Sequence, residues 1–299
     1  MFRRLLESIF YGNYFYGTCA VALSIEATLQ QHFPLNGLVF YFLLFIVTVL
    51  YYSYPYVRKS PPSGNARTNW YTRNYYFMFW NQVLISITLV ISLVVFLWRY
   101  WAEVMHMSLL NWALILIFPV VASLYYGLDS LKGKINIRKV GWSKPFVIGF
   151  TWAGLVNIYP ILLQDIMESK VYEPALVSVL LFIKNFMFIS LLCIMFDIKD
   201  YAADYLSRLK TFVVKIGLQN TVFYILIPLS ILGLGSFLVY ATSQQFSFGK
   251  IILNMIPFIL LVWAAISLLK PRSILYYLVF IDGLMFIKAV CGTIAIIYF

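Results

Sequence analysis

The chain has 299 residues, of which 63% are hydrophobic and only 11% charged, and its mean hydropathy is +0.87. A soluble domain has roughly 45–50% apolar and about 25% charged residues, so this composition excludes a water-soluble enzyme, a disordered chain and a disulfide scaffold. The net charge of +11 indicates membrane topology rather than nucleic-acid binding, because basic residues gather in cytoplasmic loops. We expect no nucleic-acid partner.

Unbroken apolar stretches of about 20 residues recur along the chain, and this length crosses a bilayer as an α-helix. They predict an all-α polytopic membrane protein in which residues 1–299 form a single transmembrane domain. A membrane β-barrel does not fit, because its strands alternate polar and apolar residues. In chain order, the nine predicted spans are residues 13–31, 36–57, 76–98, 108–127, 145–164, 174–196, 220–242, 250–269 and 274–297.

The distribution of lysine and arginine predicts the orientation of these spans. If the N-terminus is cytoplasmic, most of the 22 basic residues fall in cytoplasmic loops, and only Arg99, Lys170 and Lys250 fall in loops on the outer side of the membrane. Such a bias supports both the number of spans and their direction. One span too many or too few would place the later basic loops on the opposite side of the membrane. We therefore expect the N-terminus inside and the C-terminus outside.

The most informative polar stretch begins where the sixth predicted span ends. Asp197, Asp200 and Asp204 stand at i, i+3 and i+7, so they share one face of a helix. Three such carboxylates repel one another unless a cation lies between them, and Mg²⁺ typically binds through one or two carboxylates plus substrate phosphates. The alternative is a solvated helix end whose charge is balanced by the nearby basic residues Lys199, Arg208 and Lys210.

Asp200-x-x-x-Asp204, followed by Lys210-Thr211 and Gly217, resembles the second aspartate motif of the UbiA superfamily of intramembrane prenyltransferases. The helix-breaking glycine that the family has four residues after the second aspartate is Arg208 here. The earlier Asp197 resembles the additional aspartate of a divergent bacterial branch of the family. Nine helices with a cytoplasmic N-terminus also match the family arrangement.

The resemblance implies a nine-helix bundle around a central cavity, in the bacterial inner membrane and in contact with membrane lipids. It implies transfer of an isoprenyl group from an isoprenyl diphosphate to a lipophilic acceptor, either hydrophobic or aromatic. Asp200 and Asp204 would bind Mg²⁺, with Asp197 as a third catalytic carboxylate. The metal neutralises the leaving group, and the cavity keeps water away from the carbocation.

The family's first aspartate motif, N-x-x-x-D-x-x-x-D, is missing from the end of the second predicted span. The basic residues Arg58, Lys59, Arg67 and Arg73 stand where the carboxylates would be. Basic groups can bind a diphosphate directly. The basic loop after the fourth span either adds further phosphate donors or contacts anionic lipid headgroups. The residues that we expect to bind the substrate's phosphates are Arg58, Lys59, Lys132, Arg138 and Lys210.

Because the first aspartate motif, which is half of the family's metal site, is missing, a second hypothesis is that the protein is a non-catalytic UbiA-like membrane subunit. Such a subunit would bind lipid, or a protein partner on its cytoplasmic face. A transporter fits less well, because nine spans do not divide into two equal inverted repeats.

Four charged residues lie inside predicted spans, namely Glu26, Lys184, Asp282 and Lys288. Such residues are costly in a membrane and are usually paired. We expect a structural ion network in which Glu26 pairs with either lysine, and a proton path or acceptor site is the alternative.

Overall fold

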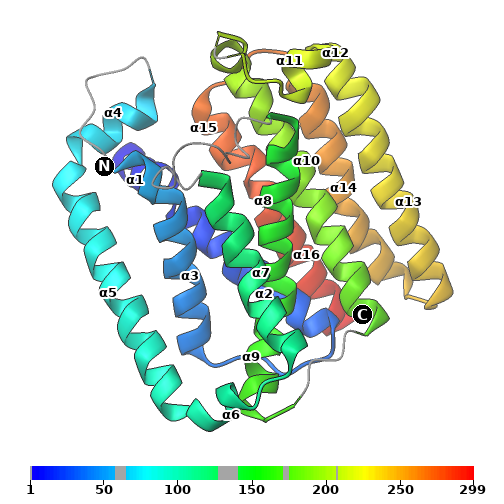
Figure 1. The fold of residues 1–299 in the computed structure, drawn as a ribbon. Coiled ribbons are helices and arrows are strands. Elements are labelled where there is room, and N and C mark those ends of the chain that lie inside the picture. Colours follow the sequence, from blue (N-terminus) through cyan, green and yellow to red (C-terminus); the bar gives the residue numbers. More distant parts are fainter. Residues whose placement is uncertain (1, 58–64, 127–140, 171–174, 207) are drawn as a thin grey trace.

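The computed structural model describes residues 2–57, 65–126, 141–170, 175–206 and 208–299. Helix makes up 86% of the structure, and the described residues contain no strand, which confirms the all-α fold. The long helices stand side by side in one bundle, and the N-terminus and the C-terminus lie at opposite ends of it (Figure 1).

All nine predicted spans coincide with helical segments of the described chain. Seven of these segments are long and apolar enough to cross a membrane; the exceptions are α2 and α7. The count of nine spans and their orientation therefore stay predictions. In chain order the segments are α2 (Tyr14–Gln30), α3 with η1 (Leu38–Ser53, Tyr54–Tyr56), α5 (Tyr75–Arg99), α7 (Leu109–Tyr126), η3 to α9 (Gly141–Met167), α10 (Leu176–Leu206), α12 to α13 (Leu218–Ser243), α14 (Phe248–Ser267) and α15 to α16 (Ile274–Tyr298).

Four shorter helices connect or precede these spans. They are α1 (Phe2–Tyr11), α4 (Ala66–Arg73), α6 (Trp101–Met105) and α11 (Phe212–Ile216). Figure 1 places α4 and α11 at the end of the bundle where the N-terminus lies, and α6 at the other end.

Three of the spans contain a π-helical turn. Turns η4 (Gly154–Ile158) and η5 (Thr221–Leu226) come shortly before a proline, Pro160 in α9 (Tyr159–Met167) and Pro228 in α13 (Ile227–Ser243). Proline lacks an N–H and its ring clashes with the carbonyl one turn back, so the backbone widens there. The third turn, η6 (Tyr277–Ile281), ends directly before Asp282 at the start of α16 (Gly283–Tyr298).

The main apolar core is formed by α2, α8 (Lys144–Ala153), α10 and α16, in which α8 packs against α10 and α2 packs against α16. Helix α5 is the opposite case, because only Met78 and Ile85 of its 25 residues are buried. A helix that exposes this much apolar surface fits a lipid-facing position at the edge of a membrane bundle. These core helices carry several of the buried charged residues described below, such as Glu26, Asp197 and Lys288.

Candidate functional site

The three aspartates lie on one face of the last turns of α10, as the sequence predicts. Asp197 and Asp204 are buried and Asp200 is half-buried. Two of them have a lysine partner. Lys144, at the start of α8, donates to Asp197 Oδ1 at 2.7 Å, and Lys199 Nζ lies 3.0 Å from Asp200 Oδ1. Part of the negative charge of the aspartates is therefore balanced by lysines of the protein. The alternative of a solvated helix end predicts this role for Lys199.

Helix α10 ends where the family motif has its glycine, although the residue here is Arg208. Its φ is 55°, a left-handed conformation that favours glycine. The N–H of Leu209 donates to the carbonyl of Asp204 at 2.9 Å, and the N–H of Arg208 donates to that of Tyr205 at 3.2 Å. These bonds close the helix in the manner of a Schellman cap, so the helix keeps its end without glycine.

The remaining residues of the motif shape the chain after α10. Thr211 is the N-cap of α11 and accepts from the N–H of Val214 at 3.4 Å, while Gly217 ends α11 with a φ of 84°. Gly141 packs against this segment, since an added Cβ would lie only 2.7 Å from the backbone nitrogen of Thr211. Lys210 is exposed beside it. The motif's threonine and glycine thus have a structural role.

A buried arginine stands near the end of α3, beside the place where the family has its first aspartates. Arg67 of α4 is 6% exposed. Its guanidinium donates to Asn13 Oδ1 and, at 3.3 Å, to the hydroxyl of Tyr56, and it lies 4.2 Å above the Tyr56 ring. These hydrogen-bond partners are neutral, and among the described residues Arg67 Nε has no hydrogen-bond partner.

Neutral aromatic groups complete the surroundings of Arg67. Asn13 donates to the Tyr71 hydroxyl at 3.0 Å, and the ring of Tyr71 stacks on that of Tyr56 with centroids 5.2 Å apart. Burial raises the pKa of Tyr71 above its ordinary value, so the hydroxyl stays neutral. Its proton is therefore retained next to the arginine's positive charge.

Asp282 is a further buried carboxylate, which lies directly before α16 and within electrostatic range of Arg67 and Lys199. Its Oδ2 has no hydrogen-bond partner among the described residues, and the carboxylate also interacts electrostatically with the Tyr16 hydroxyl. Lys199 in turn pairs with Asp200. We call Asn13, Arg67, Asp197, Asp200, Asp204 and Asp282, with the lysines bound to them, the aspartate end of the bundle.

Four of the five predicted phosphate-binding residues, Arg58, Lys59, Lys132 and Arg138, lie outside the described residues, and they stay predictions. The sequence drew attention to Arg67 only as one of several basic residues in its loop. It gave no signal for Asn13, Tyr56 or Tyr71, because their contacts join segments that are far apart in the chain.

The described part of the chain contains no group of three or more His, Cys, Asp or Glu residues that could hold a metal ion. The three aspartates of α10 therefore do not converge into a closed metal site. Two carboxylates can still hold Mg²⁺ when phosphate oxygens and water complete its six ligands.

A solved structure of a digeranylgeranylglyceryl phosphate synthase in membranes is similar to this chain, with a TM-score of 0.55. The likeness covers 99% of this chain and 100% of that one, at 15% sequence identity. That protein is a UbiA-superfamily prenyltransferase. The likeness is one of fold. The sequence matches no family model and no curated protein.

Proposed function

We propose that this integral membrane protein transfers an isoprenyl group from an isoprenyl diphosphate to a hydrophobic or aromatic acceptor. The observation that carries the proposal is the aspartate end itself. Carboxylates at the end of α10 lie at the same end of the bundle as a buried arginine, which is bound by neutral groups and whose Nε has no hydrogen-bond partner among the described residues. The fold likeness to a membrane prenyltransferase over the whole chain supports it.

In this proposal, the residues of the aspartate end have different roles in binding a diphosphate. Arg67 supplies a permanent positive charge with donors of fixed geometry, which suits phosphate oxygens. Asp200 and Asp204 are the residues that would hold Mg²⁺, which neutralises negative charge on the leaving group when it is bound. Asp197 acts as a positioning residue, because its bond to Lys144 ties α10 to α8.

Both substrates are expected to reach this end from the bilayer, because an isoprenyl chain and its acceptor are apolar. The central cavity that the family resemblance implies would hold the prenyl chain. Lys210, which is exposed, would contact the phosphates where this cavity opens to water. A bacterial inner membrane is the location that this proposal assumes.

The proposal is tested by donor binding, since the acceptor is not identified. The purified protein in nanodiscs is titrated with farnesyl and geranylgeranyl diphosphate, with Mg²⁺ and with EDTA. We expect Mg²⁺-dependent binding that falls at least tenfold in Asp200→Asn and in Asp204→Asn. Glu168→Gln at the opposite end is the control, because it also changes a carboxylate to an amide but lies away from the aspartate end. Equal binding by the wild type and both aspartate variants would remove the metal-site part of the proposal.

The non-catalytic subunit is the second candidate, and one observation favours it. Lysines already bind Asp197 and Asp200, as expected of a structural network. This candidate predicts no affinity for an isoprenyl diphosphate with or without Mg²⁺. It also predicts a protein bound over the aspartate end when the protein is purified gently from its native membrane.

A further inference from the structure

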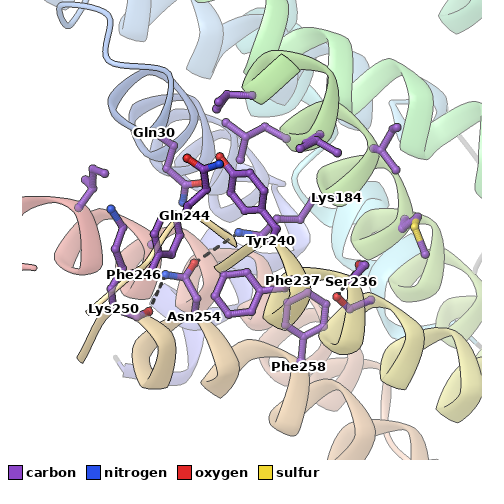
Figure 2. A pocket seen from close by; sticks show the side chains of 18 of the residues that line it. Gln30, Lys184, Ser236, Phe237, Tyr240, Gln244, Phe246, Lys250, Asn254 and Phe258 are labelled. Carbon is purple, nitrogen blue, oxygen red and sulfur yellow. Dashed lines mark hydrogen bonds between the residues drawn. The ribbon is translucent and has the colours of Figure 1, made fainter. Parts of the chain in front are cut away.

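A cavity of about 510 Å³ lies at the end of the bundle opposite to the aspartates. It is formed by the first turns of α10, the last turns of α13 and the first turns of α14, with the adjoining parts of α2 and α16 (Figure 2). Its volume falls in the range of roughly 300–1,000 Å³ that is usual for small-molecule sites. None of its lining residues belongs to the aspartate end.

One wall of the cavity is apolar and continues onto the outer surface of the bundle. Leu180 and Ile183 of α10 and Leu232 of α13 line the cavity and are also exposed. In a membrane-spanning bundle, exposed apolar residues at this depth face the lipid tails. The cavity therefore opens toward the bilayer between α10 and α13, and an apolar chain can enter from that side.

The polar groups of the cavity are basic or neutral. Its described lining residues include Lys184, Lys250 and His32 and no carboxylate. Lys184 Nζ lies 3.4 Å from Asn254 Oδ1, and Lys250 Nζ lies 4.4 Å from the centroid of the Phe246 ring. Both lysines line the same cavity (Figure 2).

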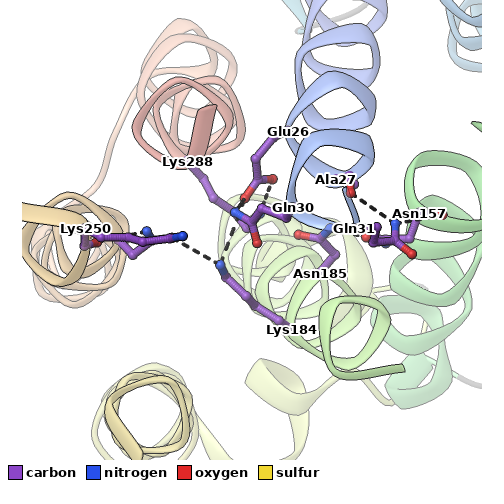
Figure 3. Close-up of polar contacts among 10 residues, drawn as sticks. Glu26, Ala27, Gln30, Gln31, Asn157, Lys184, Asn185, Lys250 and Lys288 are labelled. Carbon is purple, nitrogen blue, oxygen red and sulfur yellow. Dashed lines mark hydrogen bonds and ion pairs between the residues drawn. The ribbon is translucent and has the colours of Figure 1, made fainter. Parts of the chain in front are cut away.

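Glu26 of α2, the acid beside Lys184, already has other partners. Its side chain is completely buried, and its Oε2 accepts from Lys288 at 2.7 Å, while Gln30 donates to Oε1 at 2.8 Å. Lys184 Nζ is 3.9 Å from Oε1 (Figure 3). This arrangement confirms the predicted ion network, in which one carboxylate pairs with both lysines.

Buried amides behind Glu26 hold this wall in place. Asn185 of α10 donates to Asn157 Oδ1 at 2.9 Å, and Gln31 of α2 donates to the Asn157 carbonyl at 3.2 Å and to that of Ala27 at 3.0 Å (Figure 3). These bonds join α2, η4 and α10 next to Glu26 and Lys184. The basic side of the cavity is therefore built before any ligand arrives, which lowers the entropic cost of binding.

Lys184 and Lys288 share the one carboxylate of Glu26, and Lys250 lines the same cavity, so positive charge exceeds negative charge in a region of low dielectric. Such a charge is costly unless an anion accompanies it. We propose that the cavity binds an anionic amphiphile, with its phosphate or carboxylate head between Lys184 and Lys250 and its apolar tail leaving between α10 and α13. Tyr240 and Gln244 line the cavity as further neutral polar groups. The site is separate from the aspartate end and does not depend on the proposed function.

The test is lipid binding by the full chain in dodecyl maltoside, measured by native mass spectrometry and by the shift in melting temperature. The probes are phosphatidylglycerol, oleate, zwitterionic phosphatidylcholine and inorganic phosphate alone. We expect phosphatidylglycerol or oleate to bind at least tenfold more tightly than phosphatidylcholine, and the stronger of the two identifies the head group. Inorganic phosphate, which has no tail, is expected to cause no shift.

The variants are Lys184→Gln and Lys250→Gln, with Lys170→Gln as a control whose lysine is exposed and outside the cavity. We expect each cavity variant to lose at least tenfold in affinity for the anionic amphiphile, and the control to lose none. Lys250 is only half-buried, so its variant tests the site even if Lys184→Gln does not fold. The proposal is overturned if phosphatidylcholine binds as tightly as the anionic probes. It is also overturned if phosphate alone gives the full shift, or if Lys250→Gln binds like the wild type.

Discussion

Among the described residues, the buried and half-buried charged groups at the two ends of the bundle occur in opposite proportions. At the aspartate end, Asp197, Asp200, Asp204 and Asp282 accompany Lys144, Lys199 and Arg67. At the cavity end, Glu26 alone faces Lys184 and Lys288, with Lys250 nearby. An excess of acids suits a cation, and an excess of bases suits an anion. The ratio of charges, more than the residue types, therefore distinguishes the chemistry of the two ends.

The largest effect is expected at Glu26. Glu26→Gln leaves Lys184 and Lys288 buried without their shared carboxylate, and breaking such a buried pair costs about 3–5 kcal/mol. The free energy of unfolding, measured by titration of mixed micelles with sodium dodecyl sulfate, should fall by this amount. The double variant Glu26→Gln with Lys288→Met should recover part of the loss, because it also removes one uncompensated charge. A double variant less stable than Glu26→Gln would contradict the ion-network interpretation.

The next effect concerns Arg67 and the binding of diphosphate. Arg67→Gln removes a buried cation, and each charged hydrogen bond lost from a ligand is worth about 1.5–3 kcal/mol. Donor affinity in EDTA should therefore fall at least tenfold, because this part of the binding needs no metal. Arg73→Gln is the control, since it lies on the same helix but is exposed. Equal losses in the two variants would mean that Arg67 acts only through the net charge of the loop.

A smaller loss of stability is expected for the ion pair between Lys144 and Asp197. Asp197→Asn leaves a lysine whose side chain is 22% exposed and reaches water, unlike Lys288 beside Glu26, which is 3% exposed. We expect a cost of about 1–3 kcal/mol, measured by the same titration. Lys144→Met, which leaves the fully buried carboxylate alone, should cost more than Asp197→Asn. The opposite order would show that the exposure of the surviving partner does not control the loss.

The smallest expected effect is a gain in stability from a substitution at the end of α10. Arg208 has a φ of 55°, and a residue with a side chain costs roughly 1–2 kcal/mol more than glycine in this conformation. Replacement by glycine recovers only part of this cost, because glycine also has more conformational freedom to lose when the chain folds. Arg208→Gly should raise the free energy of unfolding by up to about 1 kcal/mol. Arg208→Ala should give no gain, because alanine has the same steric conflict.

The sequence predicted the helical segments well, because bilayer length and apolar composition are local properties. It also placed Asp197, Asp200 and Asp204 on one face, since their spacing follows from helix geometry alone. It did not predict the tyrosines and Asn13 around Arg67, whose contacts join residues up to 58 positions apart. No periodicity in a single sequence records such a contact.

The sequence by itself determined that this is an all-helical membrane protein with a row of carboxylates at one helix end, because hydropathy and helical spacing are set by neighbouring residues. Only the tertiary structure decided which charges are balanced. The sequence left open whether Glu26 pairs with Lys184 or with Lys288. In the structure α2 packs against α16, and Lys184 of α10 also reaches Glu26, so both lysines lie beside it. The Nε of Arg67, which has no hydrogen-bond partner among the described residues, follows from packing in the same way, since a buried group can only use the partners that neighbouring helices present to it.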